Sequence, residues 1–181
     1  MRIIGGKHRG RKLSEFGGDQ IRPTADRVKE SLFNILAFAI NGATVLDLFC
    51  GSGNIGLESI SRGASLVHFN DLSKDSLRVL RTNLAAMGEE SVSLVTNLDY
   101  LACLNAADRR YDFIYIDPPY RFDYGVPALE IIAKRNLLAD GGVAVYERNA
   151  PFTGAIDGLE MFDERKYGKT YLSFFRPLLR L

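Results

Sequence analysis

The chain has 181 residues, of which 46% are hydrophobic and 25% charged, with a formal net charge of +1. This length indicates one domain, and the composition of an ordinary globular protein excludes a disordered chain, a collagen and a disulfide scaffold. Only two cysteines occur, Cys50 and Cys103, and they form no CxxC pair. We therefore expect no metal site and no disulfide framework, and a reducing compartment.

No part of the sequence predicts a membrane span or a secretory signal. The longest apolar run lies near Leu32–Ile40 and is interrupted by Asn34, whereas a span requires about 20 apolar residues. The N-terminus is charged but is not followed by the apolar segment of a signal peptide. These features indicate a cytoplasmic protein, and nothing in the sequence requires more than a monomer.

The N-terminal end is basic although the charges of the whole chain nearly balance. Residues 1–22 are rich in glycine, and residues 1–12 contain no acidic residue. This segment predicts a short strand or hairpin followed by a loop, an N-terminal extension in front of a domain at 23–181. Its charge predicts a local anionic partner.

The remaining chain alternates between strand and helix patterns. A helix is predicted to begin at Pro23-Thr24, with Thr24 as its N-cap, and to end at Asn41-Gly42. Further strands are predicted from short apolar runs and helices from longer amphipathic runs. The strands are 43–49, 66–70, 92–96, 112–117, 142–147, 158–166 and 170–178, and the helices are 54–62, 73–87, 98–104 and 124–135.

This alternation predicts the α/β class, with a mostly parallel seven-stranded sheet covered by helices on both faces. The last two strands, around Tyr167-Gly168, predict a closing hairpin that adds an antiparallel strand. Ligands of such sheets bind beyond the carboxyl ends of the strands. The residues that follow each predicted strand are therefore the candidates for function.

A glycine loop follows the first strand of the predicted sheet. Gly51-Ser-Gly53-Asn-Ile-Gly56 matches the pattern G-x-G-x-x-G, and Asp71, at the end of the next strand, can accept the hydroxyl protons of a ribose. Both features fit a nicotinamide dinucleotide or S-adenosylmethionine. Asp47, near the end of the first strand, favours S-adenosylmethionine, because a carboxylate attracts its sulfonium and ammonium but repels a pyrophosphate.

Two further residues lie near this predicted site. Asp99 follows the third strand, where it can accept from an adenine amino group or provide a charge at the start of the short helix. No base is evident beside Cys50, which we interpret as a small turn residue rather than a nucleophile.

Asp117-Pro118-Pro119-Tyr120, after the fourth strand, is the most specific signal in the chain. The two prolines fix two φ angles and remove two backbone donors, so the turn presents acceptors. The Asp117 carboxylate and the Pro118 carbonyl can each accept one N–H of a planar group with an exocyclic amine, while Tyr120 stacks on its ring. Drawing both N–H groups out of the ring plane frees the nitrogen lone pair for in-line attack on a sulfonium methyl, without a metal or a covalent enzyme intermediate.

The two motifs together resemble those of amino-group S-adenosylmethionine-dependent methyltransferases. The strings from Arg2 to Leu13 and from Arg22 to Asn34 resemble the RsmD family of bacterial 16S rRNA guanine-N2 methyltransferases, over nearly the whole chain. The resemblance implies a Rossmann-like class I fold that methylates a guanine of the small ribosomal subunit, at the guanine-966 site. Two residues depart from the family pattern: Asn70, where an apolar residue is usual, and Ser73, where an acid is common.

The resemblance also implies roles for individual residues. The residues implied to bind the cofactor are Asp47, Phe49, Gly51, Ser52, Gly53, Asp71 and Asp99. The catalytic residues are Asp117, Pro118, Pro119 and Tyr120, which hold the target amine. The basic residues expected to contact RNA phosphates are Lys7, His8, Arg9, Arg11, Lys12 and Arg22. Arg121 and Tyr124 are candidates for a lip over the base, and the role of Glu147 stays open.

Several other functions remain open from the residues alone. The Asp-Pro-Pro-Tyr turn also serves an adenine-N6 DNA methyltransferase or a glutamine-methylating enzyme, although the short chain has no separate target-recognition domain for DNA. A nicotinamide oxidoreductase leaves Asp47 and the proline turn without a role. A non-catalytic RNA-binding assembly factor is a further alternative, in which Asp117 is dispensable.

Overall fold

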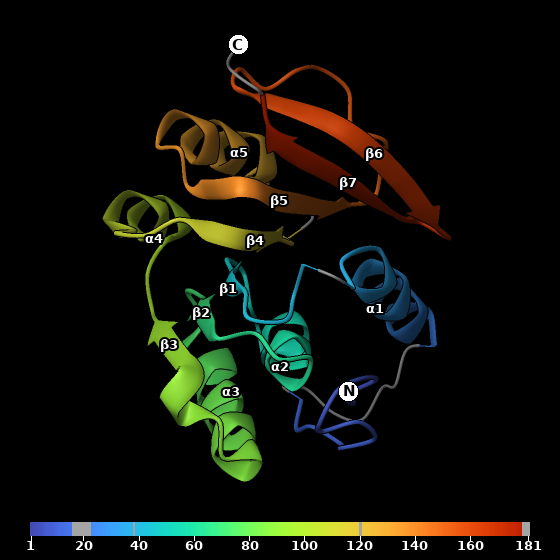
Figure 1. Ribbon diagram of the computed structural model, residues 1–181, viewed down its shortest axis with the longest axis vertical. Helices are drawn as coiled ribbons and strands as arrows, with labels where there is room; N and C mark the ends of the chain where they lie inside the picture. The colour runs from blue at the N-terminus through green and yellow to red at the C-terminus, as the bar shows by residue number, and fades with distance from the viewer. Residues whose placement is uncertain (16–22, 38, 120, 179–181) are drawn as a thin grey trace.

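The computed structural model describes residues 1–15, 23–37, 39–119 and 121–178, which form a single sheet flanked by helices (Figure 1). The strand order is β3-β2-β1-β4-β5-β7-β6. The strands are β1 (Thr44–Asp47), β2 (Leu66–Asn70), β3 (Ser93–Thr96), β4 (Tyr111–Ile116), β5 (Leu138–Arg148), β6 (Leu159–Tyr167) and β7 (Thr170–Pro177). The helices are α1 (Pro23–Ile35), α2 (Asn54–Ser61), α3 (Lys74–Met87), α4 (Tyr100–Ala106) and α5 (Gly125–Lys134), with a 3-10 turn at Glu90–Val92.

The predicted α/β class and mostly parallel sheet are confirmed. β1 to β5 are parallel, and β7 lies antiparallel between β5 and β6. The largest difference is in the first helix, which ends at Ile35 rather than near residue 41. The fourth predicted helix starts at Tyr100 instead of residue 98, because the Asp99 side chain accepts the N–H of Leu101 and caps the helix.

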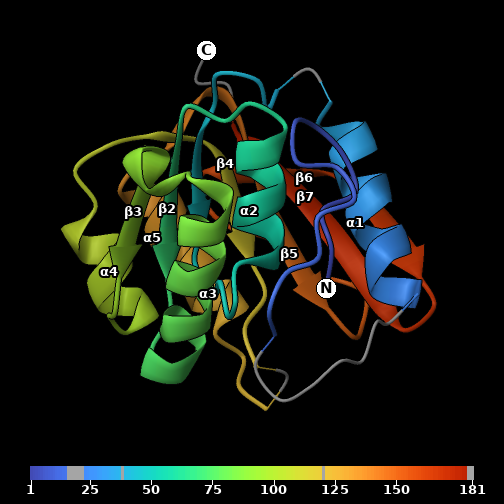
Figure 2. The ribbon, with the colours of Figure 1, turned by 90° about the horizontal axis from the view of Figure 1, so that it is seen from below.

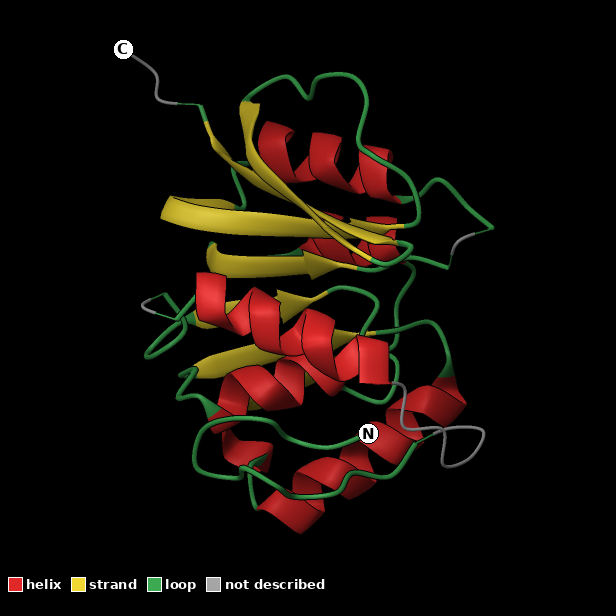
Figure 3. Ribbon diagram, turned by 90° about the vertical axis from the view of Figure 1, so that its right-hand side faces the viewer, coloured by secondary structure: helices red, strands yellow, loops and turns green. Residues whose placement is uncertain are grey.

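Two apolar layers enclose the sheet. α1, α2 and α3 cover one face and α4 and α5 the other, so the strands lie between helices in Figures 2 and 3. Neighbouring residues of β1 show this division, since Val45 belongs to the first layer and Leu46 to the second. This alternation is why strands of the sheet interior are apolar at almost every position.

The N-terminal segment is an ordered loop rather than a pair of strands. A single antiparallel bridge joins Arg2 to Lys12, and Ile3 and Leu13 are buried in the same core as α1, α2 and α3. Between them, Gly6 and Gly10 adopt positive φ angles of 75° and 84° and reverse the chain.

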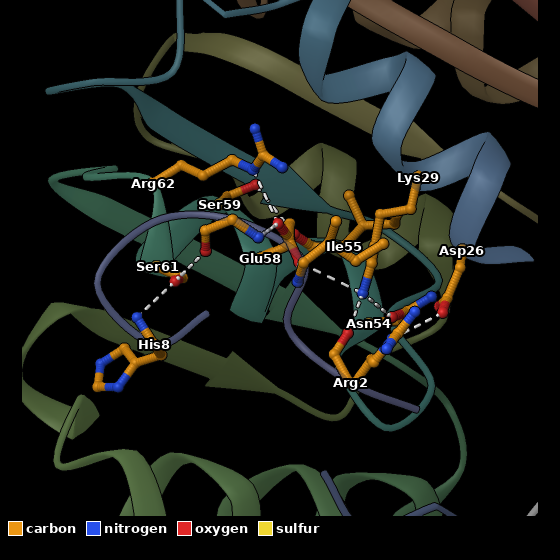
Figure 4. Close-up of polar contacts among 12 residues, drawn as sticks. Arg2, His8, Asp26, Lys29, Asn54, Ile55, Glu58, Ser59, Ser61 and Arg62 are labelled. Atoms are coloured by element: carbon orange, nitrogen blue, oxygen red, sulfur yellow. Dashed lines mark hydrogen bonds and ion pairs between the residues drawn. The ribbon is translucent and has the colours of Figure 1, made fainter. Parts of the chain in front are cut away.

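Glu58 of α2 fastens this loop to the body of the protein (Figure 4). Its carboxylate is fully buried and accepts the N–H groups of Ile4 and Gly5, both at 2.8 Å. It also pairs with Arg62 at 2.8 Å and with Lys29 of α1 at 3.3 Å. One carboxylate therefore joins the N-terminal loop, α1 and α2.

Lys29 completes this cluster at the start of α2. Its ammonium donates to the backbone oxygen of Arg2 at 2.5 Å and to Asn54 Oδ1 at 2.8 Å. Burial lowers the pKa of Lys29, and the neighbouring Glu58 carboxylate opposes that shift. Glycines allow the N-terminal loop to lie close to α2, since a Cβ on Gly6 would lie 1.8 Å from the Ser61 backbone oxygen.

Replacing Glu58 by alanine is expected to destabilise the protein strongly. The substitution leaves the Lys29 ammonium buried with fewer partners and removes the acceptor of two backbone N–H groups, which predicts a loss of about 3–5 kcal/mol in the free energy of unfolding. Urea denaturation measures it. Glu160→Ala, which breaks a surface pair with Arg176, serves as the control and should cost no more than about 1 kcal/mol. Equal losses in the two variants would contradict this account.

Candidate active site

The acidic residues predicted from the sequence gather at one edge of the sheet. Asp47 is the last residue of β1 and pairs with Phe69 of β2 and Tyr115 of β4. Asp71 and Asp117 are the first residues after β2 and β4. Because these strands are parallel neighbours, their carboxyl ends lie together, and the strand order reverses at β1, where such sheets bind ligands.

The glycine loop turns sharply between β1 and α2. Gly51 and Gly53 have φ angles of 53° and 94°, which disfavour residues with a side chain. A Cβ on Gly53 would lie 2.5 Å from Leu80 Cδ1, and one on Gly56 would lie 2.1 Å from the Phe69 ring. A Cβ on Gly51 would meet nothing within 4 Å, so the loop borders open space there.

Two carboxylates hold the loop in this shape. Asp47 Oδ2 accepts the N–H of Gly56 at 2.9 Å, and Asp71 Oδ2 accepts the N–H of Gly51 at 2.8 Å. The second oxygen of Asp71 accepts the N–H of Ser73 at 2.8 Å. Each carboxylate oxygen has a further lone pair, so Asp71 can still accept ribose hydroxyls.

Burial makes the ionised form of Asp47 costly. The side chain is 2% exposed, and desolvation raises its pKa to about 7; the Gly56 hydrogen bond opposes the shift and the Asp71 charge adds to it. A cation bound beside Asp47 would favour the carboxylate form and lower this pKa.

Asp117, in the turn after β4, lies close enough to Glu147 of β5 for the two carboxyls to interact. Desolvation raises the pKa of Asp117 well above its usual value, and the charges of Glu147 and Asp47 add to the shift. Glu147, near the end of β5, accepts a hydrogen bond from the Tyr115 hydroxyl. Pro118 is buried and Pro119 is exposed, whereas Tyr120, predicted to stack on the target, lies outside the described residues.

A stack of aromatic rings connects the segment after this turn to Phe49, which precedes the glycine loop. Phe122 stacks on Tyr124 with a centroid distance of 4.9 Å and an angle of 9°, and Tyr124 stacks on Tyr100 at 4.9 Å. Phe49, implied to contact the cofactor, contacts both tyrosines. Tyr124, considered for a lip over the base, is thus packed within the stack, and Phe122 is the exposed end. Sequence reasoning missed Tyr100 and Phe122, although each follows a predicted strand.

The acidic residue after β3 has a structural role in capping a helix. Asp99 Oδ1 accepts the N–H of Leu101 at 2.9 Å and caps α4, which is the alternative that the sequence left open. The cap uses Oδ1, so Oδ2 and the remaining lone pair can still accept from an adenine amino group.

The basic residues of the N-terminal loop divide into two groups. Lys7 and His8 contact Glu89 beyond the end of α3, at 2.7 and 2.6 Å, and Arg11 donates to the Ala86 backbone oxygen at 2.6 Å. Arg9 and Lys12 are exposed, and their side chains form no hydrogen bond or ion pair within the described part of the chain. Arg22 lies outside the described residues.

Neither a metal centre nor a membrane span is found in the described ranges. No group of three or more His, Cys, Asp or Glu residues among them could hold a metal ion. None of the helices described is long and apolar enough to cross a bilayer.

The sheet order, with the glycine loop at its switch point, defines a Rossmann-like methyltransferase fold, and known proteins share it. A solved structure of yhhF from Escherichia coli matches with a TM-score of 0.88 and 30% identity, over 98% of this chain and 97% of that one. The more distant SMU.776, solved in complex with SAH, matches with a TM-score of 0.69 and 16% identity, over 86% of this chain and 50% of that one, which shows the fold alone.

The sequence comparisons identify the family. The family model described as Conserved hypothetical protein 95 matches residues 1–176. Ribosomal RNA small subunit methyltransferase D of Haemophilus influenzae is 35% identical over an alignment of 151 residues, which covers 81% of this chain and 78% of that protein. The chain belongs to this family, and the predicted resemblance to the RsmD methyltransferases is confirmed.

Asp47→Asn is expected to stabilise the protein at alkaline pH. The folded state holds a proton on Asp47 up to about pH 7, whereas the unfolded chain releases it near 3.8. The stability contributed by that proton is therefore present at low pH and lost as the pH rises through 7. The variant, whose amide oxygen still accepts from Gly56, should match the native protein near pH 4 and exceed it near pH 8, by about 1.4 kcal/mol per unit of pKa difference. Urea unfolding across this range checks it, and a variant less stable at pH 8 would contradict it.

Proposed function

We propose that this protein transfers a methyl group from S-adenosylmethionine to the exocyclic N2 of one guanine in 16S rRNA, at the guanine-966 site of the assembled small subunit. The observation that carries the proposal is the Asp117-Pro118-Pro119 turn at the same sheet edge as the glycine loop and Asp47. The names of its relatives, rRNA small subunit methyltransferases, support ribosomal RNA as the substrate.

The residues at the switch point fit S-adenosylmethionine, and the SAH complex of a structural neighbour is consistent with it. When bound, this cofactor supplies an electrophilic methyl group on a sulfonium. The buried Asp47 carboxylate provides negative charge near the cationic methionine end, and Asp71 accepts the ribose hydroxyls. Gly51 leaves the space that a bound nucleoside requires.

The target amine is held by the turn after β4. Pro118 and Pro119 have no N–H, so this part of the turn presents only acceptors to the amine. The Asp117 carboxylate and the Pro118 carbonyl accept the two N–H groups, which directs the nitrogen lone pair towards the methyl group. The carboxylate form of Asp117 stabilises the positive charge that develops on the nitrogen. Asp117 then takes up the proton that the methylated amine releases, for which its raised pKa suits it.

Arg9 and Lys12 of the N-terminal loop are the basic residues best placed to contact RNA phosphates, because their charges are not paired with the described part of the chain. Lys7, His8 and Arg11 hold the loop against α3 and contribute to the same basic surface. Such contacts position the RNA without selecting the base.

Asp117→Ala is expected to abolish methyl transfer while leaving cofactor binding intact. Loss of the group that orients and stabilises the reacting amine predicts a decrease in kcat of about 100-fold or more. Steady-state transfer to small subunits measures kcat, and calorimetry with S-adenosylhomocysteine measures cofactor affinity. Asp140→Ala, at a fully exposed carboxylate, is the matched control and should remain active. Full methyl transfer by Asp117→Ala would contradict the role given to this carboxylate, whereas no transfer by the native protein would favour the non-catalytic assembly factor.

Neutralising Arg9 and Lys12 together, with glutamine at both positions, is expected to weaken RNA binding and to reduce its salt dependence. The logarithm of the RNA-binding constant falls linearly with the logarithm of the salt concentration, and each lost phosphate contact makes this slope shallower by about 0.7–0.9. The double variant should therefore bind with a slope shallower by about 1.4–1.8, at unchanged affinity for S-adenosylhomocysteine. Arg109→Gln with Arg110→Gln, at the opposite end of β4, is the control. A larger change of slope in the control would place the RNA surface elsewhere.

A further inference from the structure

Asn70, the last residue of β2, joins the loops that follow β1 and β3. Its side chain is 1% exposed. Nδ2 donates to the backbone oxygens of Leu48 and Leu98, at 3.2 and 3.0 Å, and Oδ1 accepts the N–H of Leu98 at 3.3 Å. The Asn70 backbone oxygen also accepts the N–H of Cys50 at 2.9 Å. One buried residue therefore contacts the glycine loop on one side and the segment before Asp99 on the other.

A chain of polar side chains fixes the orientation of the Asn70 amide. Thr96 Oγ1 donates to Asn70 Oδ1 at 2.8 Å, and His68 Nε2 contacts Thr96 Oγ1 at 2.9 Å. His68 Nδ1 contacts the Tyr111 hydroxyl at 2.9 Å. These bonds agree with one arrangement, in which Tyr111 donates to a neutral His68 and His68 donates to Thr96. Burial lowers the pKa of His68 to about 4, so the ring stays neutral at physiological pH.

Leu98 is held through both of its backbone polar groups, and the next residue is Asp99. Asp99 is fixed on its other side by the bond from its Oδ1 to the Leu101 N–H. Its backbone is thus anchored to β2 before it and to α4 after it, which sets the direction of its second carboxylate oxygen.

We propose that Asn70 is a positioning residue for recognition of the adenine ring: it holds the Leu98–Asp99 segment at the distance from the glycine loop that the adenosine part of the cofactor requires. The inference rests on the proposed function, in which Asp99 accepts from the adenine amino group. Asn70 itself touches neither cofactor nor RNA, and Thr96 and His68 act through it. Their contribution is to cofactor selectivity rather than to the methyl transfer step.

The test compares two ligands that differ at the adenine amino group. Calorimetry measures the Kd of S-adenosylhomocysteine and of S-inosylhomocysteine, which carries a carbonyl in place of that amine, for the native protein and for Asn70→Leu. The native protein should prefer the adenine ligand. The variant should bind S-adenosylhomocysteine about 10- to 100-fold more weakly and lose most of the preference, because the recognising group is misplaced. Its kcat at saturating cofactor should change little.

Two further variants separate positioning from stability. Thr96→Val removes the hydroxyl that orients the amide and should reduce the preference, but should have no further effect in the Asn70→Leu background. Ser173→Ala is the control: Ser173 is a buried serine of β7 whose hydroxyl donates to Glu164 Oε2 at 2.7 Å, away from the glycine loop. It should lower the thermal stability and leave the preference for adenine unchanged.

The outcomes distinguish this inference from the function on which it rests. An Asn70→Leu protein that melts at lower temperature but keeps the native preference for adenine would overturn the positioning role. A native protein that binds both ligands equally would overturn it as well, while leaving the methyltransferase function intact. A native protein that binds neither ligand would contradict the proposed function itself and, with it, this inference.

Discussion

The concentration of carboxylates at one edge of the sheet is the constraint on which the site depends. Parallel neighbours deliver Asp47, Asp71 and Asp117 to the same place, because their strands all end there. Desolvation raises the pKa values of Asp47 and Asp117, and repulsion from neighbouring carboxylates adds to the shift. A ligand that carries sulfonium and ammonium charges relieves this repulsion, whereas a pyrophosphate increases it. The electrostatics therefore favour S-adenosylmethionine over a dinucleotide on the same glycine loop.

Helix α2 connects this acidic edge to the basic N-terminal loop. Its first residues continue the glycine loop, and Glu58 and Ser61, further along, bind the backbone of residues 4–8. The two charged regions of the protein are thus attached to one short helix, at different ends. In the proposed function, this arrangement keeps the surface for RNA at a fixed position relative to the cofactor.

The fold was largely predictable from the sequence, because the spacing of apolar residues differs between strands and helices. Short apolar runs therefore indicated the strands, and longer amphipathic runs indicated the helices. Asp47, Asp71 and Asp117 could be found because parallel strands place the residues that follow them at one edge. Contacts between distant segments left no local signal. Gly5 and Gly6, for example, allow the N-terminal loop to lie against α2, a contact that the sequence did not indicate. Asn70 was recognised as unusual, yet its bonds to Leu48 and Leu98 depend on loops that only the folded sheet brings together.

The central claim is the identity of the methylated atom, and product analysis tests it most directly. Labelled S-adenosylmethionine would be offered with small ribosomal subunits that lack the modification, with naked 16S rRNA and with DNA, and the labelled nucleoside would be identified by mass spectrometry. The account predicts N2-methylguanosine in the subunits, at a single position. Methyladenine in DNA, or no transfer to any RNA by a protein that binds the cofactor, would contradict it.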